Sequence, residues 1–108
     1  PGLIILSDPV YICSDMFEYS EELKKYIARR DLATEGLQKC DTYLSLSQLL
    51  DMGCKPVQSD SYEEDGDEFE FYVLEKDGKR YVSIQVYEDR EGGMYHQVMY
   101  SEDGFPPA

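Results

Sequence analysis

Acidic side chains supply most of the groups that could do chemistry in this chain, and one stretch is reminiscent of a calcium-binding loop. Residues 60–67 read Asp-Ser-Tyr-Glu-Glu-Asp-Gly-Asp. An EF-hand loop has glycine at its sixth position, aspartate at its first and a bidentate glutamate at its twelfth. With Gly66 sixth, Ser61 is first and Tyr72 is twelfth, so the pattern fails at both ends. We expect no metal site and no cofactor.

Catalysis by a nucleophile or a general base needs several convergent groups, and the sequence does not supply them. His96 is the single histidine. Cys13, Cys40 and Cys54 lack the paired spacing of a zinc site or a redox dithiol. No glycine-rich phosphate loop precedes a helix, and no GxSxG or HExxH motif occurs. We therefore expect no catalytic residue and predict that the protein is not an enzyme.

Net charge is the outlying property of the composition. The chain has 23 acidic and 10 basic residues, for a net charge of −13, whereas solubility of a small domain needs roughly 2 to 8 charges. Such a surface repels nucleic acid and anionic membranes and attracts cationic partners. The odd number of cysteines disfavours a disulfide framework and favours a cytoplasmic location. Leu3–Leu6 is too short to span a membrane and lacks the basic flank of a signal peptide.

The acidic residues gather in two clusters. Seven carboxylates lie between residues 60 and 70 with no basic residue among them, and three more lie between 88 and 91. Tyrosines accompany both clusters, and tyrosine is enriched at protein interfaces. The residues predicted to bind a partner are Asp60, Tyr62, Glu63, Glu64, Asp65, Asp67, Glu68, Glu70, Tyr72, Tyr81, Tyr87, Glu88, Asp89 and Glu91.

A cationic groove that holds nucleic acid is the best physical match to this composition, because such grooves bind phosphates with Lys and Arg and stack bases on aromatic rings. We expect a small acidic inhibitor that binds a basic, nucleic-acid-binding enzyme, as the nucleic-acid-mimicking anti-restriction and anti-CRISPR proteins of phages do. The likeness is one of size and composition. An immunity or antitoxin protein that neutralises a basic nuclease toxin would use the same electrostatics. Alternatives of other classes are a small enzyme, a metal-dependent regulator, and an adaptor that binds through its sheet edge.

Helical periodicity predicts two helices that could position these residues. Asp15 and Glu18 form a capping-box pattern before a helix over 16–31, with Arg29 and Arg30 in its last turn. Residues 31–41 are expected to be a loop. Ser45 begins a second capping box, for a short helix over 46–52 that stops at Gly53.

Period-two patterns predict the strands. Gly2–Leu6 and Val10–Cys13 are short β-prone runs, and 57–67 is expected to be a polar loop. Glu68–Lys76 and Lys79–Glu88 flank Asp77-Gly78, the favoured dipeptide of a two-residue hairpin turn. In that register Val73 faces Val82, Phe71 faces Ile84 and Phe69 faces Val86. A loop over 89–93 leads to a third strand, Met94–Ser101.

The predicted fold is α+β, with the order β-α-α-β-β-β in a single domain over 1–108. A three- to four-stranded, mainly antiparallel sheet would carry both helices, one of them short, on one face. Residues 102–108 are expected to form a flexible tail. Both acidic clusters would lie at the end of the sheet remote from Asp77-Gly78. The predicted core consists of Phe69, Phe71, Val73, Val82, Ile84 and Val86 against Leu23, Ile27 and Leu49.

Overall fold

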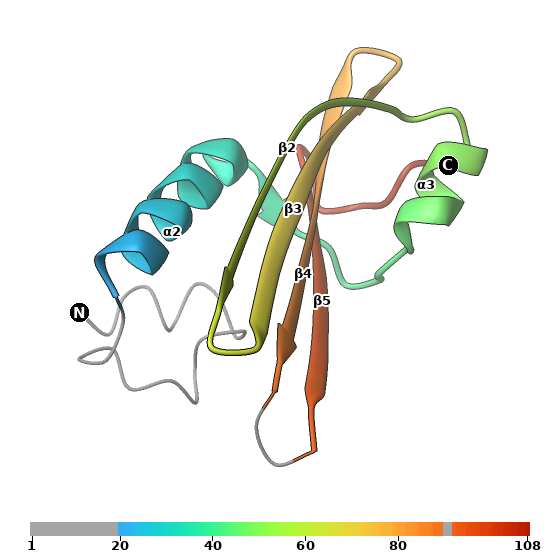
Figure 1. Ribbon diagram of the computed structural model, residues 1–108. Coiled ribbons are helices and arrows are strands. Elements are labelled where there is room, and N and C mark those ends of the chain that lie inside the picture. Colours follow the sequence, from blue (N-terminus) through green and yellow to red (C-terminus); the bar gives the residue numbers. More distant parts are fainter. Residues whose placement is uncertain (1–19, 90–91) are drawn as a thin grey trace.

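Five antiparallel strands form a single sheet, flanked by one long and one short helix (Figure 1). The structure is a computed structural model, and it describes residues 20–89 and 92–108. The strand order is β1-β5-β4-β3-β2. The α+β class is confirmed, with five strands in place of the three or four expected; the β-prone runs predicted within residues 2–13 lie outside the described residues. The elements are α2 (Glu21–Thr34), β1 (Gln38–Lys39), α3 (Leu46–Asp51), β2 (Lys55–Glu64), β3 (Asp67–Lys76), β4 (Lys79–Glu88) and β5 (Met94–Ser101).

The hairpin of β3 and β4 has the register that the sequence predicts. Asp77 and Gly78 have φ values of 53° and 80°, and two positive φ values are what a type I′ turn requires. The pairs Val73 with Val82, Phe71 with Ile84 and Phe69 with Val86 all form. The third strand is also confirmed at Met94–Ser101, and it pairs with β4.

The prediction of a loop over 57–67 is wrong, because most of this stretch forms β2, paired with β3 along its length. A second two-residue turn at Asp65-Gly66, with φ values of 51° and 86°, joins the two strands. β2 is an edge strand, and its side chains face solvent or α2. A strand in the middle of the sheet would have apolar neighbours instead. Charged residues are tolerated at such an edge, so β2 lacks the apolar alternation of a half-buried strand.

Helix α2 begins and ends later than the sequence predicts. Ser20 has an extended backbone and caps the helix, since its hydroxyl oxygen accepts a hydrogen bond from the Leu23 amide at 3.0 Å. The helix continues to Thr34, so Arg29 and Arg30 are not in its last turn. Gly36, with a φ of 80°, follows the helix end. The capping box predicted at Asp15 lies outside the described residues.

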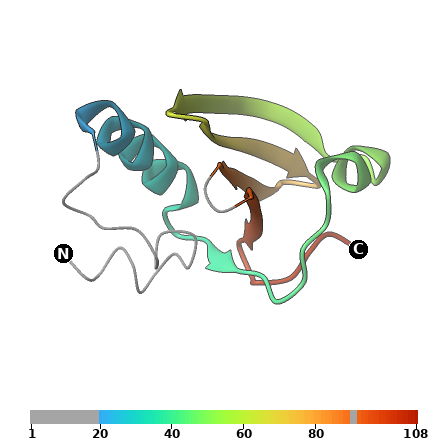
Figure 2. The same ribbon diagram turned by 60° about the horizontal axis from the view of Figure 1, so that its bottom comes forward.

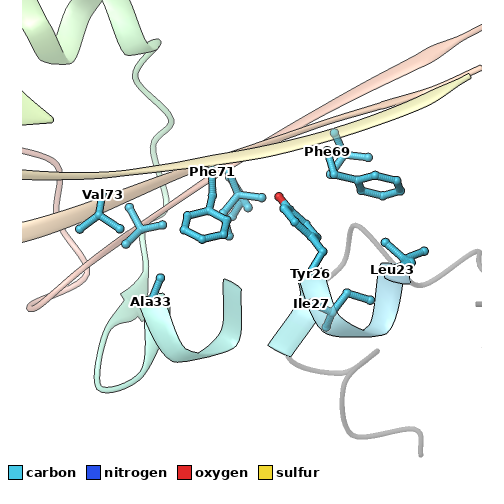
Figure 3. Close-up of a cluster of buried hydrophobic side chains, with 11 residues drawn as sticks. Leu23, Tyr26, Ile27, Ala33, Phe69, Phe71 and Val73 are labelled. Carbon is cyan, nitrogen blue, oxygen red and sulfur yellow. The ribbon is translucent and has the colours of Figure 1, made fainter. Parts of the chain in front are cut away.

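One face of the sheet packs against α2. Figure 3 shows Leu23, Tyr26 and Ile27 of the helix directed toward Phe69 and Phe71 of β3. Tyr26 is fully buried, and its ring lies 5.8 Å from each of the two phenylalanine rings. Helical spacing places these side chains on one stripe of α2, so the helix buries that stripe against alternate residues of the strands.

Helix α3 packs against the opposite face of the sheet, which corrects the prediction that both helices cover one face. Leu49 is fully buried with Leu74, Tyr81 and Met99, whose side chains alternate with those that face α2. Figures 1 and 2 show the two helices on opposite sides of the sheet. The capping box at Ser45 and Gln48 is confirmed, but helical periodicity alone does not specify which face of a sheet a helix covers.

The C-terminal residues run back toward α3 (Figure 1). Pro107 is buried, and Lys76 Nζ donates a hydrogen bond to the Ala108 carbonyl oxygen at 2.9 Å. Cys40 and Cys54 are free and buried in the cluster beneath α3. None of the described helices is long and apolar enough to cross a membrane.

Two neighbouring leucines test the placement of α3. Leu49→Ala should lower the free energy of unfolding by about 3 kcal/mol, because it leaves a cavity in a fully buried position. Leu50→Ala, where the side chain is 44 % exposed, should change it by less than about 0.5 kcal/mol. Urea unfolding measures both, and equal losses in the two variants would contradict the packing of α3.

Candidate partner-binding face

Helix α3 covers only part of its side of the sheet, the part near Asp77-Gly78. The other part, at the end of the sheet remote from that turn, we call the open face. Its side chains come from β2 to β5, and they are all polar or aromatic. The open face consists of Ser61, Glu63, Glu68, Glu70, Gln85, Tyr87, Tyr95 and Gln97.

Strand pairing arranges the open face as two rows that cross four strands. Side chains directly opposite one another on paired strands lie about 5 Å apart at Cβ, and the rows are about 7 Å apart because same-face residues are two positions apart. The row nearer the end of the sheet is Glu63, Glu68, Tyr87 and Tyr95. The inner row is Ser61, Glu70, Gln85 and Gln97.

Negative charge on the open face is concentrated at β2 and β3. Glu63 and Glu68 are direct cross-strand partners, an arrangement in which two like charges destabilise a sheet. Glu70 lies beside Glu68 in the adjacent row. None of the residues described on this face is basic. The fold therefore holds three carboxylates at close spacing where their mutual repulsion costs stability.

The two acidic clusters of the sequence meet at the end of the sheet remote from Asp77-Gly78, as predicted. The Asp89 amide donates a hydrogen bond to Asp67 Oδ1 at 2.8 Å, so the β2–β3 turn lies beside the end of β4. Figure 1 shows both connections at the same end. Asp65 and Asp89 are exposed there. Glu91 lies outside the described residues.

Like Asp67, three more of the carboxylates predicted to meet a partner have partners within the chain. Asp60 binds the Arg29 guanidinium, and Glu64 accepts hydrogen bonds from the hydroxyls of Ser20 and Tyr62. Glu88 is buried and lies 3.0 Å from His96 Nε2. These contacts lie on the α2 side of the sheet, because the side chains have the opposite alternation to Glu63 and Glu68. The single acidic patch expected from the sequence is therefore divided between two faces.

The pKa values of these internal groups follow from their contacts. The hydrogen bond from Arg29 lowers the pKa of Asp60. Hydrogen bonds from Ser20 and then Tyr62 lower the pKa of Glu64. The same carboxylate raises the pKa of the Tyr62 hydroxyl. Both carboxylates are thus held in the charged form by α2 and its neighbours, and they help to attach the helix to β2.

Two of the tyrosines predicted to bind a partner pack instead in or against the apolar cluster beneath α3. Tyr81 is 4 % exposed in that cluster, and Tyr72 packs against it while only partly buried. Burial raises the pKa of both hydroxyls, and nearby Glu70 adds to the rise for Tyr72. Tyr81 and Tyr72 lie on the side of the sheet away from α2, but α3 and its connections cover Tyr81. Of the tyrosines predicted on β3 and β4, Tyr87 alone belongs to the open face.

Protein-family models, curated proteins and solved structures were compared with this chain. None matches it. Among the described residues, no three His, Cys, Asp or Glu side chains are grouped so that they could hold a metal ion. Residues 60–67, whose likeness to a calcium loop fails at both ends, form the end of β2, a two-residue turn and the start of β3.

Sequence reasoning missed half of the open face. Tyr95, which is 55 % exposed, pairs with Tyr87, and Gln97 pairs with Gln85. The predicted strand Met94–Ser101 carried the signal, since continuing the hairpin register across the 89–93 loop places Tyr95 opposite Tyr87. Ser61 was missed because its strand was assigned to a loop. The dipeptide Asp65-Gly66, which has the same turn signature as Asp77-Gly78, could have identified that strand.

Asp60→Asn tests the role of Asp60 as a structural ion pair. A carboxyl with a lowered pKa in the folded state adds stability above its unfolded pKa of about 4 and loses it as the pH falls. The variant should therefore be less stable by roughly 1 kcal/mol or less at pH 7. The difference should shrink as the pH falls toward about 2. Urea unfolding at both pH values measures this, and an equal loss at both would contradict the ionic role.

Glu63→Gln tests whether the open face carries unfavourable charge. Removing one of two opposed carboxylates should raise the free energy of unfolding by a few tenths of a kcal/mol, about 0.2–1, in low salt. The gain should shrink in about 1 M salt, where the screening length is about 3 Å. Asp41→Asn removes the same charge from an exposed loop position and is the control. A destabilised Glu63→Gln variant would contradict the repulsion.

Proposed function

We propose that the protein is an acidic binding protein, not an enzyme, that occupies the cationic surface of a nucleic-acid-binding enzyme and thereby inhibits it. The observation that carries this proposal is the pairing of Glu63, Glu68 and Glu70 with Tyr87 and Tyr95 on one exposed face. Carboxylates and aromatic rings are the two kinds of group that such a surface binds when it holds a nucleic acid.

Charge spacing supports the proposal. The Cβ atoms of the three glutamates recur about 5 Å apart across the strands and about 7 Å apart along β3. They stand on paired strands, so the backbone fixes the points from which the side chains extend. Preorganised charges lose less entropy when they meet a complementary surface. A cationic groove would therefore attract these carboxylates, and the sheet backbone that carries them would not have to rearrange on binding.

The carboxylates have different roles on the two sides of the sheet. Asp60 and Glu64 attach α2 to β2, and Glu88 lies against His96. Glu63 and Glu68 are opposed across two strands with Glu70 beside them, an arrangement expected to lower the stability of the sheet. A property that costs stability and is spread over two strands is best explained by a use outside the folded chain. This favours the open face, over the α2 side, as the partner-binding surface.

Capture from a lysate of the source organism tests the proposal. The tagged full chain should recover a basic protein that binds nucleic acid, and a double-stranded DNA or RNA oligonucleotide should compete for it. The triple variant Glu63→Gln, Glu68→Gln, Glu70→Gln should lower recovery at least about tenfold, because three charge contacts are lost. Raising the salt concentration should release the wild-type complex.

A charge-matched variant is the control for that experiment. Glu35→Gln, Asp41→Asn and Asp51→Asn remove three exposed carboxylates elsewhere on the described surface. They should reduce recovery much less than the open-face triple variant. An equal loss of recovery in both variants would show that net charge, and not the open face, accounts for the binding. Binding to a neutral or acidic partner that withstands high salt would contradict the proposed function.

A further inference from the structure

The open face contains a hollow between its two rows of side chains. Glu68, Glu70, Gln85, Tyr87 and Tyr95 line it, and they come from β3, β4 and β5. Its volume is about 120 Å³, which is enough for the end of one long side chain and too little for a nucleotide or a folded segment. The hollow is therefore a candidate site for a single side chain of a partner.

Local contacts hold the two tyrosines in place. The Tyr95 hydroxyl donates a hydrogen bond to Gln85 Oε1, which joins two of the lining residues. The Tyr87 ring packs beside Gly93, where a Cβ would lie 2.5 Å from the Tyr87 hydroxyl oxygen. Gly93 has a φ of 85°, so glycine both permits the turn and leaves room for the ring. The walls of the hollow are thus built before a ligand arrives.

The lining combines two chemical properties. Glu68 and Glu70, whose Cβ atoms lie about 7 Å apart along β3, place two carboxylates on one side. The rings of Tyr87 and Tyr95, cross-strand partners of each other, stand on the other side. A ligand must therefore be cationic to satisfy the carboxylates, and it must have a face that can lie against an aromatic ring.

Resting on the proposed function, we propose that this hollow binds the guanidinium group of an arginine side chain on the cationic surface of the partner. Guanidinium is planar and weakly hydrated, donates hydrogen bonds to carboxylates in pairs, and stacks on aromatic rings. A lysine ammonium could meet the carboxylates, but it is strongly hydrated and has no plane to place against Tyr95. Arginine is thus favoured over lysine by the tyrosines, whereas the glutamates attract both.

Two small probes of equal charge test the site without the partner. The full chain, labelled with ¹⁵N, is titrated at constant ionic strength with N-acetyl-arginine amide and with N-acetyl-lysine amide. The arginine probe should give saturable amide shifts centred on Glu68, Glu70, Gln85, Tyr87 and Tyr95. Its affinity should exceed that of the lysine probe by about threefold or more, because only the guanidinium is planar and weakly hydrated enough to stack on the ring.

A matched pair of variants separates the ring from its hydroxyl. Tyr95→Leu should bring the preference for arginine over lysine close to one, whereas Tyr95→Phe keeps the ring and should keep the preference. Because Tyr95 is exposed, both variants should retain the wild-type amide spectrum away from the hollow. Glu68→Gln with Glu70→Gln should weaken both probes by a similar factor.

Several outcomes would overturn the arginine site. Equal affinity for the two probes, no saturable shift, shifts centred elsewhere, or an unchanged preference in Tyr95→Leu would each do so. The proposed function fails differently. If the triple glutamine variant loses the captured partner while the wild-type chain shows no preference for the arginine probe, the proposed function stands and the arginine site falls. If the probes behave as expected but no basic partner is captured, the site stands and the inhibitory function falls.

Discussion

The register of the β3–β4 hairpin is the constraint on which the rest of the structure depends. Asp77 and Gly78 both adopt positive φ, and the turn that they form fixes which residue of β3 lies opposite which residue of β4. Because side chains alternate between faces, this choice sends Phe69 and Phe71 toward α2 and sends Glu68 and Glu70 to the other side. A slip of one residue would exchange these sets, burying carboxylates beneath α2 and exposing the aromatic core.

A difference in length between the strands and the helices creates the exposed surface. Strands β2, β3 and β4 each have ten residues, whereas α3 has six. The longer α2 supplies the core on its own side, but α3 protects only the cluster around Leu74 and Tyr81. The remaining part of that face must be polar to stay in contact with water. Its composition is more specific than this requirement, since glutamates and tyrosines are used where threonine or lysine would also be compatible with a strand.

Sequence patterns predicted the parts of the fold that depend on local chemistry. Asp77-Gly78 gave the hairpin and its register, and Ser45 with Gln48 gave the start of α3. The edge strand β2 escaped prediction because acidic residues are common in loops and its Asp65-Gly66 turn lies within the same acidic run. The face covered by α3 depends on the path of the chain between α2 and β2. Periodicity within a helix contains no information about that path.

The sequence predicted the charge of the candidate site and its place along the sheet, but not which face of the sheet each carboxylate occupies. Charge composition treats Asp60, Glu63 and Glu64 as equivalent, although their alternation on β2 gives them different tasks. Asp60 and Glu64 accept hydrogen bonds across the interface with α2, so there the negative charge stabilises the fold. Glu63 faces Glu68, so there the negative charge opposes the fold. An edge strand that alternates between these two uses of a carboxylate joins the core on one face to a surface suited to a cationic partner on the other. The same alternation explains why the strand resembles a loop in its composition and yet has a fixed position in the sheet.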